Sequence, residues 1–202
     1  AASDVYKRQF EYGKTRLRFS IPLPHGEDQG QQGWVLATVV EFSSEKLIHA
    51  SDIQGPMSDR ALQFILDEEP SAVIVGGPPT YLTGFKVPED SIKIGMDNLA
   101  AVVRKVPLVI ADHHLLRAQN SIQELSAISA VAKPIGHSIL TAAEYIRESP
   151  QLLEANRKEM YQKEPPSKRF IKWAKLGKEK QRQVSPPVEL GGRKKGGTSG
   201  SR

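Results

Sequence analysis

Three strand-like runs of apolar residues each end close to a side chain that can bind a metal ion. In chain order, these side chains are His25, Asp52 and the neighbouring pair His113 and His114. Imidazole nitrogen and carboxylate oxygen are ligands that suit Zn, Mn or Fe. We therefore predict that the three strand ends converge and bind a divalent metal, with Zn as the first choice and Mn or Fe as alternatives.

Each of these residues also has an interpretation without a metal. Asp52 lies in residues 48–57, where a strand meets a Gly-Pro turn, and an Asp there often only caps the turn. His25 lies in a Pro/Gly loop, where a histidine is usually solvated. His113 and His114 are adjacent and cannot easily both point inward, so we expect at least one of them to be structural.

Composition limits the classes of protein that the chain can represent. Its 202 residues, of which 39% are hydrophobic, are enough for one substantial core. There is no Cys, which excludes disulfides, iron–sulfur clusters and thiolate zinc sites and is compatible with a reducing cytoplasm. No apolar run approaches the roughly 20 residues of a membrane span, and no secretory signal is recognisable. We expect a cytoplasmic protein without a membrane partner.

The positive charge is concentrated in the last quarter of the chain. Residues 157–202 carry 14 Lys or Arg against 4 Glu, so this segment has a net charge of +10. Residues 1–156 carry 14 basic against 19 acidic side chains, a net charge of −5. The basic pI is therefore no evidence that the main domain binds nucleic acid. A solvated tail is the simplest interpretation of the basic segment, and nonspecific binding of nucleic acid is the alternative.

The pattern of apolar residues predicts an α/β (α+β) fold with a mixed sheet and outer helices. The expected strands are residues 10–12, 17–21, 34–42, 47–50, 72–75 and 108–111. The expected helices are residues 58–69, 92–106, 120–132, 138–148 and 151–162. The Gly-Gly-Pro-Pro run at 76–79 lacks the Gly-Lys-Ser/Thr ending of a phosphate loop and is expected to be a rigid turn.

Four short segments, taken together, resemble the metallo-β-lactamase superfamily. They are residues 22–26, 50–56, 76–82 and 112–117. Within that superfamily the chain is most similar to an uncharacterised, mostly archaeal branch of predicted metal-dependent hydrolases, over about residues 10–176. The resemblance implies that the chain forms the C-terminal portion of an αββα sandwich with a dinuclear metal site on its rim.

The resemblance also assigns individual roles at this site. His25 corresponds to the isolated histidine ligand, Asp52 to the carboxylate that bridges two metals, and His113 to the last histidine. Superfamily nucleases carry an Arg four residues after that histidine, and here Arg117 follows His113 at this spacing. The resemblance therefore favours His113 over His114 as the ligand.

The first motif of the superfamily, His-x-His-x-Asp-His, does not occur in this sequence. We therefore expect an N-terminally truncated fragment that is inactive by itself. Residues 1–9 resemble a translated sequencing adapter and are expected to be non-native. The expected domain covers residues 10–176, and residues 177–202 are expected to form a basic disordered tail.

The expected chemistry is metal-assisted hydrolysis of a small-molecule or phosphodiester substrate, with Asp52 orienting the attacking water. Ser51 and Asp112 are candidates for supporting hydrogen bonds to the ligands. Thr80, Tyr81 and Arg117 are candidates for binding an anionic substrate, since Arg favours phosphate and carboxylate. The alternative function is a non-enzymatic nucleic-acid-binding protein that acts through the basic tail.

Overall fold

The structure is a computed structural model that describes residues 9–30 and 32–187. The chain divides into two compact units, Ala1–Asn156 and Arg157–Arg202. Of the segment expected to be non-native, residues 1–8 lie outside the described residues, while Gln9 begins the first strand. Residues 188–202 of the expected tail also lie outside the described part.

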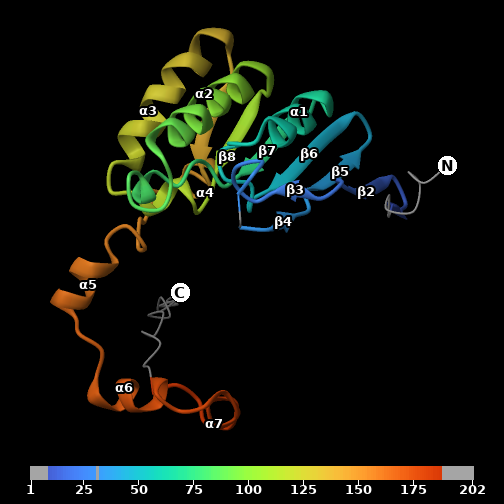
Figure 1. Cartoon of the computed structure of the whole chain (residues 1–202). Helices are drawn as coiled ribbons and strands as arrows, with labels where there is room; N and C mark the ends of the chain where they lie inside the picture. The colour runs from blue at the N-terminus through green and yellow to red at the C-terminus, as the bar shows by residue number, and fades with distance from the viewer. Residues whose placement is uncertain (1–8, 31, 188–202) are drawn as a thin grey trace, which may run out of the picture. The chain divides into compact units, whose positions relative to one another are not determined.

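The first unit is organised around a seven-stranded mixed sheet with the strand order β1-β2-β5-β6-β7-β8-β9 (Figure 1). The strands are β1 Gln9–Tyr12, β2 Thr15–Phe19, β5 Thr38–Phe42, β6 Glu45–Ala50, β7 Ala72–Val75, β8 Leu108–Ala111 and β9 Ser138–Thr141. The pairs up to β5·β6 are antiparallel, whereas the three pairs from β6 to β9 are parallel. A separate two-stranded sheet joins β3 (Leu23–Pro24) to β4 (Trp34–Val35).

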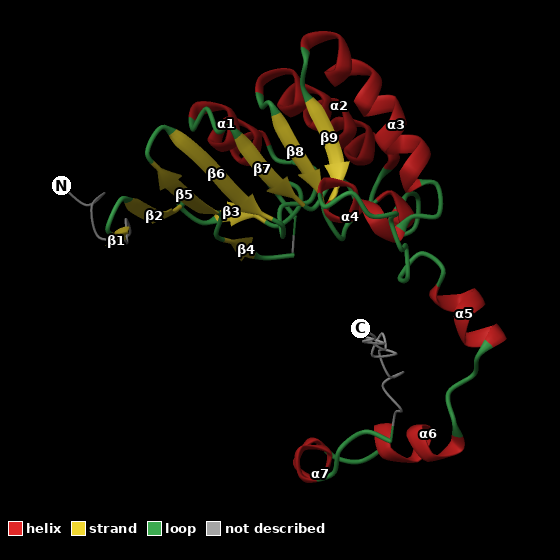
Figure 2. Cartoon of the chain, turned by 180° about the vertical axis from the view of Figure 1, so that it is seen from behind, coloured by secondary structure: helices red, strands yellow, loops and turns green. Residues whose placement is uncertain are grey.

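Three long helices connect the parallel strands and pack together on one face of the sheet (Figures 1 and 2). They are α1 Asp59–Asp67, α2 Glu89–Lys105 and α3 Ser121–Ala132, and the short helix α4 (Ala142–Tyr145) follows β9. Parallel neighbours require such crossover connections, because the chain must return to the same edge of the sheet before each new strand. Ser58 caps α1 as expected, since its hydroxyl accepts a hydrogen bond from the Ala61 N–H.

The core lies between the helices and the face of the sheet that they cover. One residue from each of five neighbouring strands lies in register on this face, and all five are buried: Val39, Ile48, Val73, Val109 and Ile139. They belong to one apolar cluster with Leu99, Val102 and Val103 of α2. Burying a side chain of this kind contributes roughly 1.5–3 kcal/mol, so this layer supplies most of the driving force for folding.

The opposite face of the sheet has no helix of the first unit against it among the described residues (Figures 1 and 2). Its apolar side chains alternate with those of the core, and they are only half-buried: Val40, Leu47, Ile74, Ile110 and Leu140. The described residues therefore form one large sheet covered on one side. The second large sheet that an αββα sandwich requires is absent from them, so only the α/β class and the mixed sheet with outer helices are confirmed.

Three predicted elements differ from the structure. Residues 138–148 are not one helix, because Ser138–Thr141 forms β9 and only Ala142–Tyr145 is helical. The buried Ile139 and Thr141 alternate with half-buried neighbours along β9, and Thr141 forms a capping box with Glu144 that begins the helix at this point. The expected strand 34–42 is divided into β4 and β5, and the expected helix 151–162 is replaced by a helix that begins at Arg157.

The second unit contains three short helices, α5 Arg157–Lys163, α6 Lys168–Ala174 and α7 Lys178–Gln183. None of them has a buried residue. Helix α7 lies within the segment that was expected to be disordered. In the part of the chain that the structure describes, no helix has the length and apolar character needed to cross a membrane.

A group of four charged side chains joins the antiparallel strands to the end of α1. Arg18 on β2 donates hydrogen bonds to Glu41 at 2.7 Å and to Glu68 at 2.6 Å, and Lys46 Nζ lies 3.1 Å from the Glu68 carboxylate. The hydrogen bond from Arg18 lowers the pKa of Glu68 most strongly; burial opposes it and Lys46 adds to it. Glu68 therefore contributes stability as the charged form.

We predict that Glu68→Gln destabilises the chain by roughly 1.5–3 kcal/mol at pH 7, the range for hydrogen bonds to charged groups. Because folding lowers the pKa of Glu68 below its ordinary value of 4.5, the contribution is complete above that value and is lost as the pH falls through the folded pKa. Urea unfolding of wild type and variant between pH 3 and 7 measures the difference. Glu69→Gln, an exposed neighbour, is the control, and equal effects of both substitutions would contradict the prediction.

Candidate metal centre

Three loops at one edge of the structure bring two histidines and an aspartate together. Asp52 follows β6, His114 follows β8, and His25 follows β3 of the small sheet. Each of these side chains offers a ligand atom, and the three atoms lie within 4.8 Å of one another. The two strands of the large sheet that supply ligands are parallel, so their carboxyl ends meet at the edge where α/β proteins commonly bind ligands.

The two imidazoles face each other, and the carboxylate faces outward. The Nε2 atoms of His25 and His114 are 3.4 Å apart. His114 is 5% exposed, His25 is half-buried, and the Asp52 side chain is 67% exposed. The backbone also fixes the position of His25, since its carbonyl accepts a hydrogen bond of 2.9 Å from the Gln54 N–H. The cluster is therefore anchored on the His114 side and open to solvent on the Asp52 side.

The turn after β7 makes room for His114. A Cβ atom added to Gly76 would lie 2.4 Å from the Ser51 carbonyl oxygen and 2.6 Å from Cδ2 of His114. Gly77 has a φ of +76°, and a Cβ there would lie 2.6 Å from Cβ of Leu115. The Gly76 carbonyl in turn accepts a hydrogen bond of 2.8 Å from the Leu115 N–H. The two glycines allow the loop after β8 to lie directly against the end of β7.

The environment of His114 keeps its imidazole neutral. The pKa of His114 is lowered to about 4, chiefly by burial and further by its neighbours His113, His25 and Arg117, against the opposing effect of Asp52. Its Nδ1 is buried without a hydrogen-bond partner among the described residues. A buried polar atom left unpaired costs roughly 1–3 kcal/mol. A neutral imidazole whose Nε2 faces a second histidine, with a carboxylate nearby, fits a site for a divalent metal ion.

His113 belongs to a second group of contacts at the same edge. Its Nδ1 lies 3.6 Å from the Asp112 carboxylate, and its Nε2 lies 3.8 Å from Oδ1 of Asp52. The Ser51 hydroxyl donates a short hydrogen bond to Asp112. Burial raises the pKa of Asp112, but the hydrogen bond from Ser51 and the charge of His113 outweigh it, so the net pKa lies below the ordinary value. Asp112 is therefore a carboxylate that orients His113 toward Asp52.

The geometry places His114 rather than His113 among the three converging ligand atoms. The sequence favoured His113 because of its spacing to Arg117. That spacing does not show which of the two imidazoles has space beside the turn after β7. The sequence also did not predict that Gln54, which anchors His25, is buried. The sequence contains no signal for it, because Gln54 is a polar residue in a Gly-Pro turn.

The three expected substrate-binding residues do not form one group. The Thr80 hydroxyl donates to Glu124 of α3 at 2.9 Å, so it supports the loop after β7. Tyr81 and Arg117 lie together, with the guanidinium 5.9 Å from the centre of the Tyr81 ring and Nη1 donating to the hydroxyl at 3.1 Å. Arg117 is thereby held in one orientation near the loop that carries His113.

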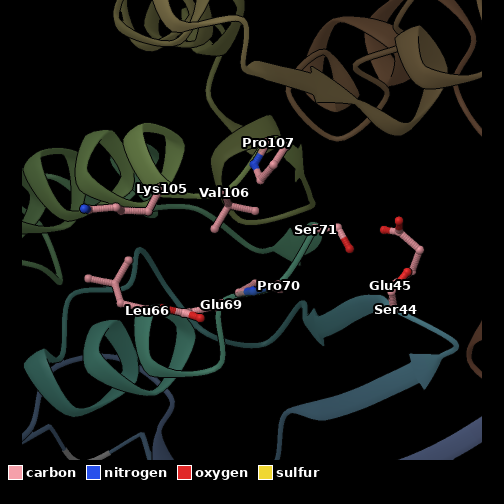
Figure 3. Close-up of a pocket in the computed structure, with 9 residues that line it drawn as sticks. All are labelled: Ser44, Glu45, Leu66, Glu69, Pro70, Ser71, Lys105, Val106 and Pro107. Carbon is pink, nitrogen blue, oxygen red and sulfur yellow. The ribbon is translucent and has the colours of Figure 1, made fainter.

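A larger pocket, of about 520 Å³, lies at the opposite edge of the sheet and is shown in Figure 3. Its lining includes Pro70 and Ser71 just before β7 and Val106 and Pro107 just before β8, so it lies at the amino ends of these strands. It contains Glu45, Glu69 and Lys105 but no histidine. Among the described residues, the only group suited to a metal lies at the other edge, so we place the functional site there.

Fold and site together define an α/β chain with a His/Asp/His cluster at the carboxyl ends of its parallel strands. Its sequence is similar to those of UPF0282 proteins from archaea. The identity is 38% to the one from Methanopyrus kandleri, over 76% of this chain and 51% of the relative. It is 35% to the one from Sulfolobus acidocaldarius, over 76% and 50%, and 34% to the one from Saccharolobus solfataricus, over 78% and 51%.

The chain thus spans about half the length of the curated relatives it matches. No family model matches it, and no solved structure does. The prediction that the chain belongs to the metallo-β-lactamase superfamily is wrong, because its relatives are named UPF0282 proteins and none of the matches indicates that superfamily. Four short segments in the right order were too weak a signal to assign a superfamily.

We predict that Gly76→Ala both destabilises the chain and disturbs His114. The added Cβ has no space, so the loop after β8 must shift; overpacking of this kind typically costs about 1–3 kcal/mol. Urea unfolding measures the loss, and the NMR signals of the His114 ring report the displacement. Gly177→Ala is the control, since a Cβ at Gly177 has no atom within 4 Å. An unchanged His114 signal in Gly76→Ala would refute this account.

Proposed function

We propose that this chain carries a divalent metal centre held by His25, Asp52 and His114 and that the protein is a metal-dependent hydrolase. The observation that carries the proposal is the convergence of the three ligand atoms within 4.8 Å at the carboxyl edge of the sheet. Two nitrogens and one carboxylate oxygen form the donor set of several catalytic zinc sites, which keep a further position open for water or substrate. We propose Zn as the ion, with Mn or Fe as alternatives.

The exposed side of the cluster suits catalysis better than a purely structural role. A bound divalent ion would lower the pKa of water and polarise a carbonyl or phosphoryl oxygen of the substrate. Asp52 has a largely exposed carboxylate, which orients the attacking water by accepting a hydrogen bond from it. His113, held between Asp112 and Asp52, is placed to donate a hydrogen bond to a substrate oxygen.

The second metal ion, the substrate and the cellular location stay predictions. A second ion, shared through Asp52 as in a dinuclear centre, would need His113 and further ligands. The substrate is proposed to be a small molecule or a phosphodiester. A cytoplasmic location is likewise a proposal, based on the absence of Cys.

We predict that the purified wild-type chain binds about one Zn per molecule, and that His25→Ala, Asp52→Ala and His114→Ala each weaken binding. The loss should be at least as large as the roughly 10–100-fold typical of removing a supporting residue around a metal. Competition with a chromophoric chelator measures the affinity, and mass spectrometry under native conditions measures the stoichiometry.

His49→Ala is the matched control. His49 is an exposed histidine on β6 whose side chain lies on the sheet face opposite to the core, so its removal should leave Zn binding unchanged. Circular dichroism of each variant establishes that it is folded. Equal Zn affinity in the wild type and in folded His114→Ala and Asp52→Ala would overturn the proposed centre.

The charge of the second unit favours a second candidate function, nonspecific binding of nucleic acid. Residues 157–202 carry a net charge of +10, against −5 for residues 1–156. Helix α6 combines Lys and Arg with two aromatic rings, Phe170 and Trp173, whose centres are 5.7 Å apart. Basic side chains bind phosphates and aromatic rings stack on bases, so this unit has both contacts needed for single strands.

We predict that the double variant Arg169→Gln, Lys172→Gln weakens binding to a single-stranded DNA oligonucleotide. It should also make the dependence of log K on log salt shallower by about 1.4, because each lost phosphate contact removes about 0.7 from the slope. Fluorescence anisotropy at several salt concentrations measures both. The control is a second double variant, Lys93→Gln, Lys105→Gln, in the first unit. If its slope is as shallow as that of Arg169→Gln, Lys172→Gln, the second unit is excluded as the binding surface.

A further inference from the structure

A small pocket lies beside the candidate metal centre, and we propose that it binds the substrate through one charged and one apolar contact. Its volume is about 260 Å³. The lining combines the polar side chains of Asp112, His113 and Arg117 with leucines. The inference rests on the proposed hydrolytic function, and it adds a substrate class: a small organic oxyanion, phosphate or carboxylate, with an apolar substituent.

His113 links the pocket to the candidate metal centre. This side chain lines the pocket, and its Nε2 is 3.8 Å from the Asp52 carboxylate. A molecule that occupies the pocket therefore contacts a side chain that itself lies beside the Asp52 carboxylate. The larger pocket lies at the amino ends of the strands, at the opposite edge of the sheet from the cluster.

Arg117 supplies the charged contact. Its guanidinium is held over the Tyr81 ring and donates one hydrogen bond to the Tyr81 hydroxyl. No carboxylate among the described residues forms an ion pair with it. A guanidinium has five N–H donors in a planar fork that matches a carboxylate or phosphate. Arg117 is therefore preorganised for an oxyanion, which lowers the entropic cost of binding.

The apolar contact comes from Leu116, next to Arg117, and from Leu152 and Leu153 after α4. Leu153 is 58% exposed, so a ligand that covers it removes apolar surface from water. The pocket volume lies just below the roughly 300–1,000 Å³ of sites for drug-sized ligands, so it suits a small molecule. The lining also includes the Asp112 carboxylate, which favours one negative charge over two on the ligand.

Isothermal titration calorimetry of the full chain, with and without Zn, tests the proposal with three probes: inorganic phosphate, phenyl phosphate and benzoate. Arg117→Gln should weaken all three by at least about tenfold, as expected for a lost charge-assisted bidentate contact. Leu153→Asn, which removes the apolar contact without adding a charge, should weaken phenyl phosphate and benzoate but leave inorganic phosphate unchanged within about twofold, since only the aromatic probes reach the leucines. The tighter of the two aromatic probes identifies phosphate or carboxylate as the preferred oxyanion.

Two exposed positions on α2 provide matched controls, Arg104→Gln for the charge and Ile94→Asn for the leucine. If Arg117→Gln and Arg104→Gln bind every probe equally, the pocket assignment is overturned. Zn affinity is measured on the same samples. If the wild type binds Zn but Arg117→Gln binds the probes as the control does, only the substrate class is rejected. If the wild type binds no Zn, the hydrolase proposal is rejected together with the inference that rests on it.

Discussion

The loops that carry Asp52 and His114 are separated by one strand, because β7 lies between β6 and β8 in the parallel part of the sheet. Neighbouring strands are spaced by about 4.8 Å, so the ends of β6 and β8 are about 10 Å apart. Their side chains can meet only above the end of β7, and that end must not carry a side chain of its own. Gly76 fulfils this condition, since the Ser51 carbonyl and the His114 ring both close on the space that a Cβ would fill.

This constraint explains why the sequence predicted where the candidate site lies better than it predicted which residues form it. Strand runs that end in Asp52 and in the pair His113 and His114 were recognisable from apolar residues followed by polar ones, and parallel pairing brings such ends together. Which of two adjacent histidines turns inward depends on the backbone after β7. No periodicity in the sequence predicts the course of this backbone. The Gly-Gly-Pro-Pro run predicted a rigid turn but did not show that the turn leaves space for the His114 ring.

The errors in the fold have a related origin. Residues 138–148 were predicted as one helix, yet the first four of them complete the sheet as β9. Strand β9 is short, and its assignment depends on pairing with β8, a contact between residues about thirty positions apart. The core strands 72–75 and 108–111 were predicted correctly, since they are continuous apolar runs with Pro shortly before them and Gly or Asp directly after them. The superfamily assignment failed because it depended on short motifs that many folds can share.

The half-buried face of the sheet has a practical consequence for work on the isolated chain. Val40 and Leu47 lie in one row of this face and Ile74, Ile110 and Leu140 in the next, and water reaches this apolar surface even when every strand is in register. Fluorescent dyes that bind apolar surface will therefore respond to the fully folded chain, a signal usually taken as the mark of a molten globule. Kosmotropic salts will promote self-association through the same apolar surface. Near-ultraviolet circular dichroism is therefore the safer criterion of native packing.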